Sequence, residues 1–288
     1  MVLKDKRYVA LFLAPTLLLV ALFLYYPLGR NFYYSFTQFD GYSKAKFIGW
    51  DNYTRMLSDP IIGKALINTF ILLVFAVIFQ VGLSVILAVM LDSVKRGYKF
   101  FRTVFFFPVV ISGTAIGLMF SLIYGYDYGM LNSLLMQLGL EKQVWLNETR
   151  SLTLVLVPTI WQYVGLYFVI MLTAISKIPD EIYESAQLEG ITGVKKTIYI
   201  VIPLIWDVIT TSVMLIITGV LKTFDTIWVI TKGGPLNATE LLSTYMYRKT
   251  FTDQVFSYGA TISVLIIVLG VLLSIVANKL LKRESVTL

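Results

Sequence analysis

Long runs of apolar residues alternate with shorter polar segments along most of the chain. A helix that crosses the hydrocarbon core of a bilayer needs roughly 20 mainly apolar residues. Six segments meet this requirement, at about residues 8–28, 66–91, 101–124, 152–175, 197–220 and 258–280. Prolines and glycines inside them are tolerated, because neighbouring helices can pair the freed backbone groups. The pattern predicts an all-α integral membrane protein with six transmembrane helices, and residues 1–288 are expected to form a single transmembrane domain.

The first span follows Lys4, Lys6 and Arg7, an arrangement that also begins a secretory signal peptide. Its apolar run exceeds the roughly 7–15 residues of a signal-peptide core, and no small-residue cleavage site follows it. We therefore expect a retained helix.

The composition agrees with a membrane protein and removes several kinds of chemistry. Apolar residues make up 57% of the chain and charged residues 14%, against roughly 45–50% and 25% in soluble domains. The chain has no cysteine and no histidine, so disulfides, thiol catalysis and imidazole-based acid–base or metal chemistry are excluded. No metal site and no cofactor are expected in this chain.

Basic residues predict the orientation. With the N-terminus in the cytoplasm, 13 of the 24 Lys and Arg residues lie in the cytoplasmic stretches 1–7, 93–102, 176–196 and 279–288. The other 11 are spread over about twice that length in the outer segments 29–65, 125–151 and 221–257. Because positive charge concentrates on the cytoplasmic side, both termini are predicted to be cytoplasmic. The net charge of +7 could suggest a nucleic-acid partner. The basic residues are scattered in short loops between apolar spans, which argues against that interpretation.

The cytoplasmic loop 176–196 carries helix signals of its own. Pro179 suits a first helical position, Asp180 and Glu181 suit the positive end of the helix dipole, and Gly190 is a natural stop. We expect a short helix there and a second from about residue 191 to residue 196. From these signals alone, an amphipathic linker at the membrane surface is an open alternative.

The spacing within this loop is specific. Glu184-Ser185-Ala186, three residues, Gly190, nine residues and Ile200-x-Ile202-Pro203 resemble the EAA loop of permeases of binding-protein-dependent ABC importers. That motif reads E-A-A, three residues, G, nine residues, I-x-L-P. Ser185 and Ile202 are its mild departures here.

A second stretch resembles the carbohydrate branch of that family. Residues 224–235, Phe-Asp-Thr-Ile-Trp-Val-Ile-Thr-Lys-Gly-Gly-Pro, are similar to its F-D-x-I-x-x-x-T-x-G-G-P region, and residues 47–53 and 65–69 look like the same branch. The resemblance covers nearly the whole chain. It implies a permease subunit of an ATP-driven sugar importer, most simply for a di- or oligosaccharide. Glycerol 3-phosphate or another small polar solute remains an alternative.

The resemblance also implies partners and coupling residues. The sequence has no G-x-x-x-x-G-K-[ST] motif, so ATP and Mg²⁺ would bind to a separate ATPase. The implied partners are a second homologous permease, two cytoplasmic ATPase subunits and an extracellular solute-binding protein, in a bacterial-type cell membrane. Glu184, Ser185, Ala186, Gly190 and Pro203 would couple the chain to the ATPase, with Glu184 as the charge contact.

The resemblance places the substrate path in the fourth span and just before the Phe224-Asp225 motif. The implied path residues are Thr159, Gln162, Tyr163, Leu166, Gly219, Val220 and Thr223. Trp161 and Tyr163 can equally be packing or membrane-interface residues. Asp207, the one carboxylate inside a predicted span, suits an interhelical or subunit contact better than a substrate contact.

Two other classes of function make different demands. An ion-coupled secondary transporter would show inverted repeats and several intramembrane ionisable groups. A membrane-embedded enzyme would need a nucleophile, a base or a metal cluster at depth. The sequence shows none of these patterns. It also lacks an Arg away from the ends of the spans, which favours a neutral sugar over a phosphate.

Overall fold

A computed structural model describes residues 6–94 and 97–282 of the chain. These residues divide into two compact units. Unit 1 contains the chain up to Ile62 together with Tyr245–Val268, and unit 2 contains Gly63–Thr244 together with the chain from Leu269 onward. The predicted path residues and the predicted coupling loop all belong to unit 2.

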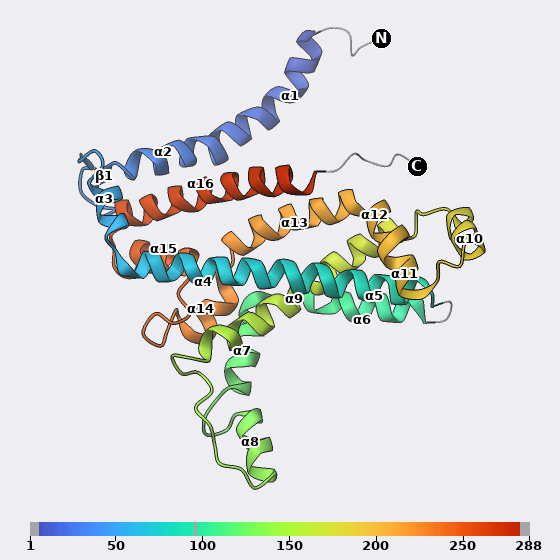
Figure 1. Cartoon of the computed structure of the whole chain (residues 1–288). Helices are drawn as coiled ribbons and strands as arrows, with labels where there is room; N and C mark the ends of the chain where they lie inside the picture. Colours follow the sequence, from blue (N-terminus) through green and yellow to red (C-terminus); the bar gives the residue numbers. More distant parts are fainter. Residues whose placement is uncertain (1–5, 95–96, 283–288) are drawn as a thin grey trace. The chain divides into compact units, whose positions relative to one another are not determined.

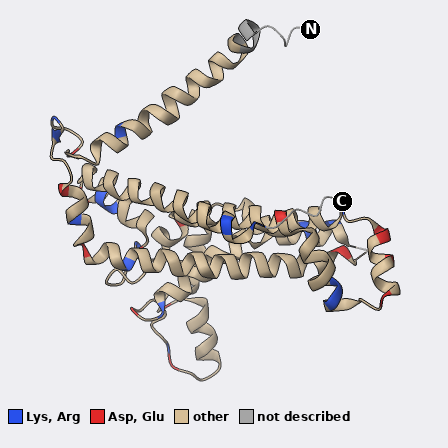
Figure 2. Ribbon diagram, turned by 45° about the horizontal axis from the view of Figure 1, so that its top comes forward, with Lys and Arg blue, Asp and Glu red and all other residues tan. Residues whose placement is uncertain are grey.

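Most of the described chain is helical (Figure 1). Helical segments long and apolar enough to cross a bilayer are Phe12–Tyr34, Pro60–Asp92, Ser151–Ile175, Trp206–Thr231 and Phe256–Leu281. A sixth is formed if the bent pair Tyr98–Val110 and Gly113–Ile123 is counted as one span. Six spans were expected, and the fold class, an all-α membrane protein, is confirmed. Figure 2 shows the shafts of the long helices almost free of charged residues.

Several spans are built from more than one helical segment. The first comprises α1 (Lys6–Val20), the π-helix η2 (Ala21–Tyr25) and α2 (Tyr26–Tyr34), and the second comprises α4 (Pro60–Ala76), η3 (Val77–Val81) and α5 (Gly82–Asp92). The fourth and sixth are the single helices α9 (Ser151–Ile175) and α16 (Phe256–Leu281). The π-helical turns η2 and η3 lie within long apolar runs, and the pattern of hydrophobic residues did not predict them.

The third predicted span, 101–124, is not a single straight helix. It is two helices, α6 (Tyr98–Val110) and α7 (Gly113–Ile123), bent by 90°. Ile111 and Ser112 have extended backbones between them. The Ser112 hydroxyl accepts a hydrogen bond from the Ala115 N–H at 3.2 Å, so Ser112 caps a new helix instead of continuing the old one.

The fifth predicted span, 197–220, is not one continuous helix either. It comprises η4 (Thr197–Val201), the short α12 (Ile202–Leu204) and α13 (Trp206–Leu221), with a break at Ile205. Pro203 lacks the N–H that would pair with the preceding turn. After α13 the chain enters α14 (Asp225–Thr231).

Unit 1 departs from an all-α fold in one small element. Strands β1 (Thr37–Gln38) and β2 (Lys46–Phe47) pair antiparallel, and the Asn52 side chain donates to the carbonyl groups of Ser35 and Thr37 beside them. Unit 1 also contains α3 (Asp51–Leu57) and η5 (Arg248–Thr252), and α15 (Leu242–Tyr247) is divided between the two units.

Helix α9 is the centre of unit 2 and packs against α5 and α6. The buried core beside the coupling loop comprises Val85, Ala88, Leu91, Phe168, Met171, Leu172, Ile175, Ile178, Val201, Ile205 and Ile209. This core anchors the segment with α10 (Asp180–Leu188) and α11 (Gly193–Lys196). The remaining element, α8 (Met130–Gln137), lies between α7 and α9 in the sequence.

Candidate substrate path and coupling loop

A cavity of about 360 Å³ lies among α9, α13 and α14 of unit 2. Residues from the fourth span and from the segment before the Phe224-Asp225 motif line it together. They include every residue predicted for the path: Thr159, Gln162, Tyr163, Leu166, Gly219, Val220 and Thr223. Side chains from two separate parts of the sequence thus converge on one space.

The polar path residues are tied to the backbone. Gln162 is 3% exposed, and its Nε2 donates to the Ile111 carbonyl at 2.9 Å. That carbonyl belongs to the bend between α6 and α7, where the helical pattern stops. The hydroxyls of Thr159 and Thr223 donate to carbonyls one turn earlier, at 2.7 Å and 3.2 Å. The Gln162 amide therefore supports the bend as well as lining the cavity.

The two aromatic residues beside Gln162 face different spaces. Tyr163 is 41% exposed and lines the same cavity as Gln162, although adjacent helical residues point about 100° apart. Trp161 lines a separate, apolar cavity of about 820 Å³ and meets the Phe120 ring with the centroids 6.2 Å apart. The packing interpretation fits Trp161, whereas Tyr163 is on the cavity wall.

Sequence reasoning missed several polar or small residues of this cavity, among them Gln80, Gly113, Lys222 and Asp225. Gln80 lies in the π-helical turn η3, and its Nε2 donates to the Ile160 carbonyl at 3.3 Å. No sequence signal indicated that turn. The helix start at Gly113 could have been predicted, because a serine after Pro108 can act as an N-cap.

The short helix expected in the loop 176–196 is present as α10, and the geometry of its end explains Gly190. The Ile191 N–H donates to the Ala186 carbonyl at 2.8 Å, and the Gly190 N–H donates to the Gln187 carbonyl at 3.0 Å. These two bonds form a Schellman motif, which requires a left-handed residue after the helix. Gly190 fills that position with φ of +75°. The second short helix begins at Gly193 rather than at residue 191.

The predicted coupling residues occupy different environments. Glu184 and Ser185 are exposed, Ala186 is buried, and Pro203 is exposed in α12. The Ser185 hydroxyl donates to the Glu181 carbonyl at 2.8 Å. This motif therefore presents its charge outward and packs its alanine inward.

Glu184 lines a cavity of about 520 Å³ in which acidic groups gather. Asp92 and Asp180 also line it, and the Lys196 ammonium lies 4.5 Å from the centre of the Tyr183 ring. Burial, and then the charges of Asp92 and Asp180, raise the pKa of Tyr183 to about 12. Tyr183 is therefore a neutral phenol at physiological pH. Charged residues gather in this α10–α11 segment (Figure 2).

Asp207 lies away from the substrate cavity. It is the second residue of α13, in the first turn, and its side chain is exposed in this chain. The sequence placed it about ten residues into a helix, but the break at Ile205 puts it at a helix start. A carboxylate there is favoured by the helix dipole.

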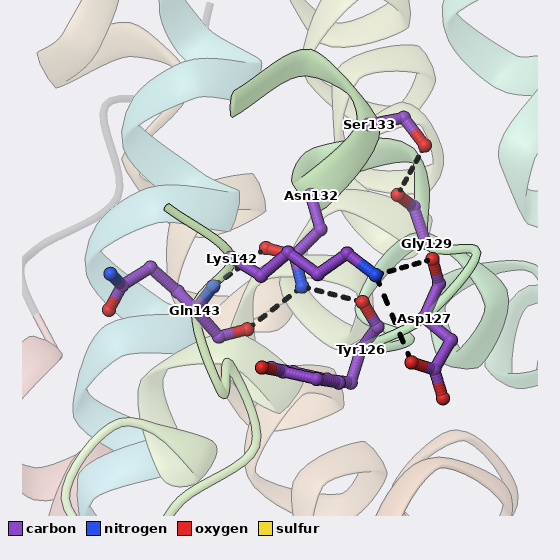
Figure 3. Close-up of polar contacts among 7 residues, drawn as sticks. All are labelled: Tyr126, Asp127, Gly129, Asn132, Ser133, Lys142 and Gln143. Atoms are coloured by element: carbon purple, nitrogen blue, oxygen red, sulfur yellow. Dashed lines mark hydrogen bonds and ion pairs between the residues drawn. The ribbon is translucent and has the colours of Figure 1, made fainter. Parts of the chain in front are cut away.

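The segment between α7 and α9 is organised around the fully buried Asn132 (Figure 3). Its Nδ2 donates to the carbonyls of Tyr126 and Gln143 at 2.9 Å each, and its Oδ1 accepts from the Gln143 N–H at 3.0 Å and the Trp145 Nε1 at 2.9 Å. The Lys142 ammonium lies 3.8 Å from Asp127 Oδ1. One amide thus closes a loop of about twenty residues into a defined shape.

Comparison with known proteins places these features in a family. Residues 80–285 match the family described as "Binding-protein-dependent transport system inner membrane component". The chain is 36% identical to the probable ABC transporter permease protein YurN of Bacillus subtilis, with 98% of each chain covered. It is 33% identical to the lactose transport system permease protein LacF of Rhizobium radiobacter, covering 92% of this chain and 90% of that protein.

A solved structure has the same fold. It is a bacterial alginate ABC transporter in complex with an alginate pentasaccharide-bound periplasmic protein, matched with a TM-score of 0.85 at 22% identity over 99% of this chain and 97% of that chain. Together with the family match and the near full-length relatives, this leads to one conclusion: the chain belongs to the family of inner membrane components of binding-protein-dependent transport systems, which are transport subunits rather than enzymes.

Proposed function

We propose that this chain is the permease subunit of an ATP-driven importer whose substrate is a di- or oligosaccharide. The observation that carries the proposal is the convergence of all seven path residues on one cavity of unit 2, which also holds the coupling loop. Relatives named for lactose and for diacetylchitobiose support a sugar substrate. The cavity combines aromatic faces with hydroxyl and amide groups, which suits sugar rings.

Within this proposal, both units act as one transmembrane domain in a bacterial-type cell membrane, with both termini in the cytoplasm. A second homologous permease completes the pore, because the EAA-type motif occurs once in the chain. Two cytoplasmic ATPase subunits bind ATP and Mg²⁺ and receive α10. The acidic cavity beside Glu184 supports α10 as the contact, since it suits a basic side chain of the ATPase.

On the outer side, the extracellular solute-binding protein contacts the segment built on Asn132. Tyr128, Met130 and Leu138 in this segment are more than half exposed. Exposed tyrosine and methionine are enriched at protein interfaces. The hydrogen bonds of Asn132 hold their backbone in one arrangement before the partner arrives, which reduces the entropy lost on binding.

The test is sugar uptake by the complete transporter in ATP-loaded proteoliposomes. Gln162→Ala and Thr223→Ala should each lower uptake at least tenfold while basal ATPase activity is retained. Thr173→Ala is the matched control, because Thr173 on α9 makes the same bond to the preceding turn and does not line the cavity. Full uptake by both path variants would contradict the proposed path, and absence of sugar uptake by the wild-type complex would contradict the function.

A further inference from the structure

The substrate cavity contains two charged side chains that do not belong to the predicted path. Lys222 follows the end of α13, Asp225 begins α14, and both are exposed to the cavity. Within residues 6–94 and 97–282, neither takes part in an ion pair. Both lie within Trp206–Thr231, a segment long and apolar enough to cross a bilayer, and not in an outer segment as the sequence pattern predicted. Charged groups inside such a segment cost free energy, and those without a structural partner mark substrate or ion pathways.

Asp225 is held in a defined place by the start of α7. The Thr226 hydroxyl donates to the Gly113 carbonyl at 3.3 Å. A Cβ atom on Gly113 would lie 3.1 Å from the Asp225 Cβ and 3.2 Å from the Thr226 Oγ1. Because glycine has no side chain, the first turn of α14 can pack closely against the start of α7.

This close packing also explains how a carboxylate is tolerated here. A Cβ on Gly113, the first residue of the 11-residue helix α7, would be only 3.6 Å from the Asp225 Oδ2. The positive end of a helix dipole favours negative charge within its first turn. The α7 terminus thus stabilises the Asp225 carboxylate without occupying it in an ion pair.

The chemistry of the pair indicates the ligand. A carboxylate accepts hydrogen bonds from two adjacent hydroxyls, and an ammonium donates up to three. Such bonds to charged groups are stronger than neutral ones. A singly charged ligand would be attracted by one side chain and repelled by the other, whereas an uncharged polyol satisfies both. Tyr163 and Phe224 on the same wall add apolar faces for a sugar ring.

We propose that Asp225 and Lys222 bind hydroxyl groups of an uncharged saccharide unit as it passes the cavity. This assignment rests on the proposed function and adds a charged, hydroxyl-binding subsite to it. The two residues act on the substrate directly, and Gly113 acts as a positioning residue for Asp225.

The experiment measures uptake in ATP-loaded proteoliposomes that contain the full transporter and its solute-binding protein. The sugars are lactose, maltose, raffinose and N,N′-diacetylchitobiose. Asp225→Asn should lower the uptake of the transported sugar by roughly tenfold or more, since a charge-assisted hydrogen bond is lost. Lys222→Met should lower it in the same direction. The elution volume of the complex, which reports correct folding and assembly, should stay unchanged.

Asp51→Asn is the matched control. Asp51 also begins a seven-residue helix, lies outside the cavity and is exposed, so the same change at a helix start should leave uptake within twofold. The charge-swapped double variant Lys222→Asp with Asp225→Lys separates ligand binding from a structural pair. A pair that only neutralises itself would recover uptake when swapped, and recovery would overturn the inference.

The results separate this inference from the proposed function. Sugar uptake by the wild type together with normal uptake by Asp225→Asn would overturn the subsite and leave the proposed function standing. If the wild-type complex took up none of the four sugars and none stimulated its ATPase activity, the proposed function would fail and the subsite with it.

Discussion

Gly165 of α9 lies against the backbone of Phe105 in α6. A Cβ atom at position 165 would overlap the Phe105 carbonyl oxygen and would lie 2.9 Å from the Phe106 Cα. Real Cβ atoms do not approach a backbone oxygen so closely, so α6 and α9 can adopt this contact only with glycine at the crossing. Small residues allow such close approach of membrane helices.

We predict that Gly165→Ala destabilises the protein by about 1–3 kcal/mol or more, because α6 must move away from α9. The midpoint of thermal unfolding of the purified complex measures this. Gly82→Ala is the control, since a Cβ at the start of α5 meets nothing within 4 Å. Equal midpoints for the two variants would show that the crossing is looser than described.

Gly190→Ala should weaken the coupling loop through its backbone. An L-residue at φ of +75° costs about 1–2 kcal/mol, although a Cβ there would have free space. Sugar-stimulated ATPase activity should fall in Gly190→Ala. It should fall less in Gly190→Asn, because asparagine tolerates the left-handed conformation. If the alanine and asparagine variants behaved alike, the left-handed conformation would not be the reason that glycine is needed at position 190.

Gly190→Arg is expected to abolish transport.

Glu184→Lys should abolish transport while insertion into the membrane survives, because the charge facing the ATPase is reversed. Sugar-stimulated ATPase activity of the reconstituted complex reports the loss. Glu189→Lys is a suitable comparison, since Glu189 is exposed at the end of the same helix and does not line the acidic cavity. Normal stimulation in Glu184→Lys would exclude the coupling role.

Asn132→Ala should weaken the response to the solute-binding protein without changing basal ATPase activity. Removing the side chain deletes four hydrogen bonds, and each satisfied buried bond contributes about 0.5–1.5 kcal/mol. The concentration of binding protein that gives half-maximal stimulation should rise. Ser133→Ala, which removes one bond to the Gly129 carbonyl, should leave it nearly unchanged. The same shift in both variants would argue against the Asn132 segment as the contact.

The orientation can be tested with single cysteines, because the native chain has none. Ser185→Cys should resist a membrane-impermeant thiol reagent applied to intact cells, and Glu148→Cys should react; both positions are exposed. Ser243 would be a poor probe, since it is 6% exposed and donates to the Thr223 carbonyl. Val2, at the terminus, lies outside the described residues. Labelling of position 185 from outside would reverse the topology.

The spans were predictable because burial in lipid demands long apolar runs whatever the tertiary fold. Their internal breaks were not, because hydropathy averages over about 20 residues and a bend occupies two. Pro108, Pro158 and Pro203 were visible, yet Pro158 lies within the continuous helix α9, whereas breaks follow Pro108 and Pro203. A proline alone therefore does not tell a tolerated kink from a break.

The candidate site shows the same limit. The seven path residues came from a family resemblance, whereas Lys222 and Asp225 stood beside them in the sequence and were assigned no path role. Their exposure to one cavity depends on the chain leaving α13 and entering α14 within three residues. Gln80 depends on a π-helical turn and on the packing of a different span. Only the tertiary structure joins these groups.

The bend at Ile111 and Ser112 divides one span between two sets of neighbours. α6 packs on α9, whereas α7 packs mainly on α14. A straight span would hold both sets of neighbours along one axis. Here two extended residues connect the halves, so α7 turns away from α6 by 90° and packs on α14 apart from the α6–α9 contact. The Gln162–Ile111 hydrogen bond ties this bend to α9, so the change of direction is fixed from the wall of the cavity through which we propose that a solute passes.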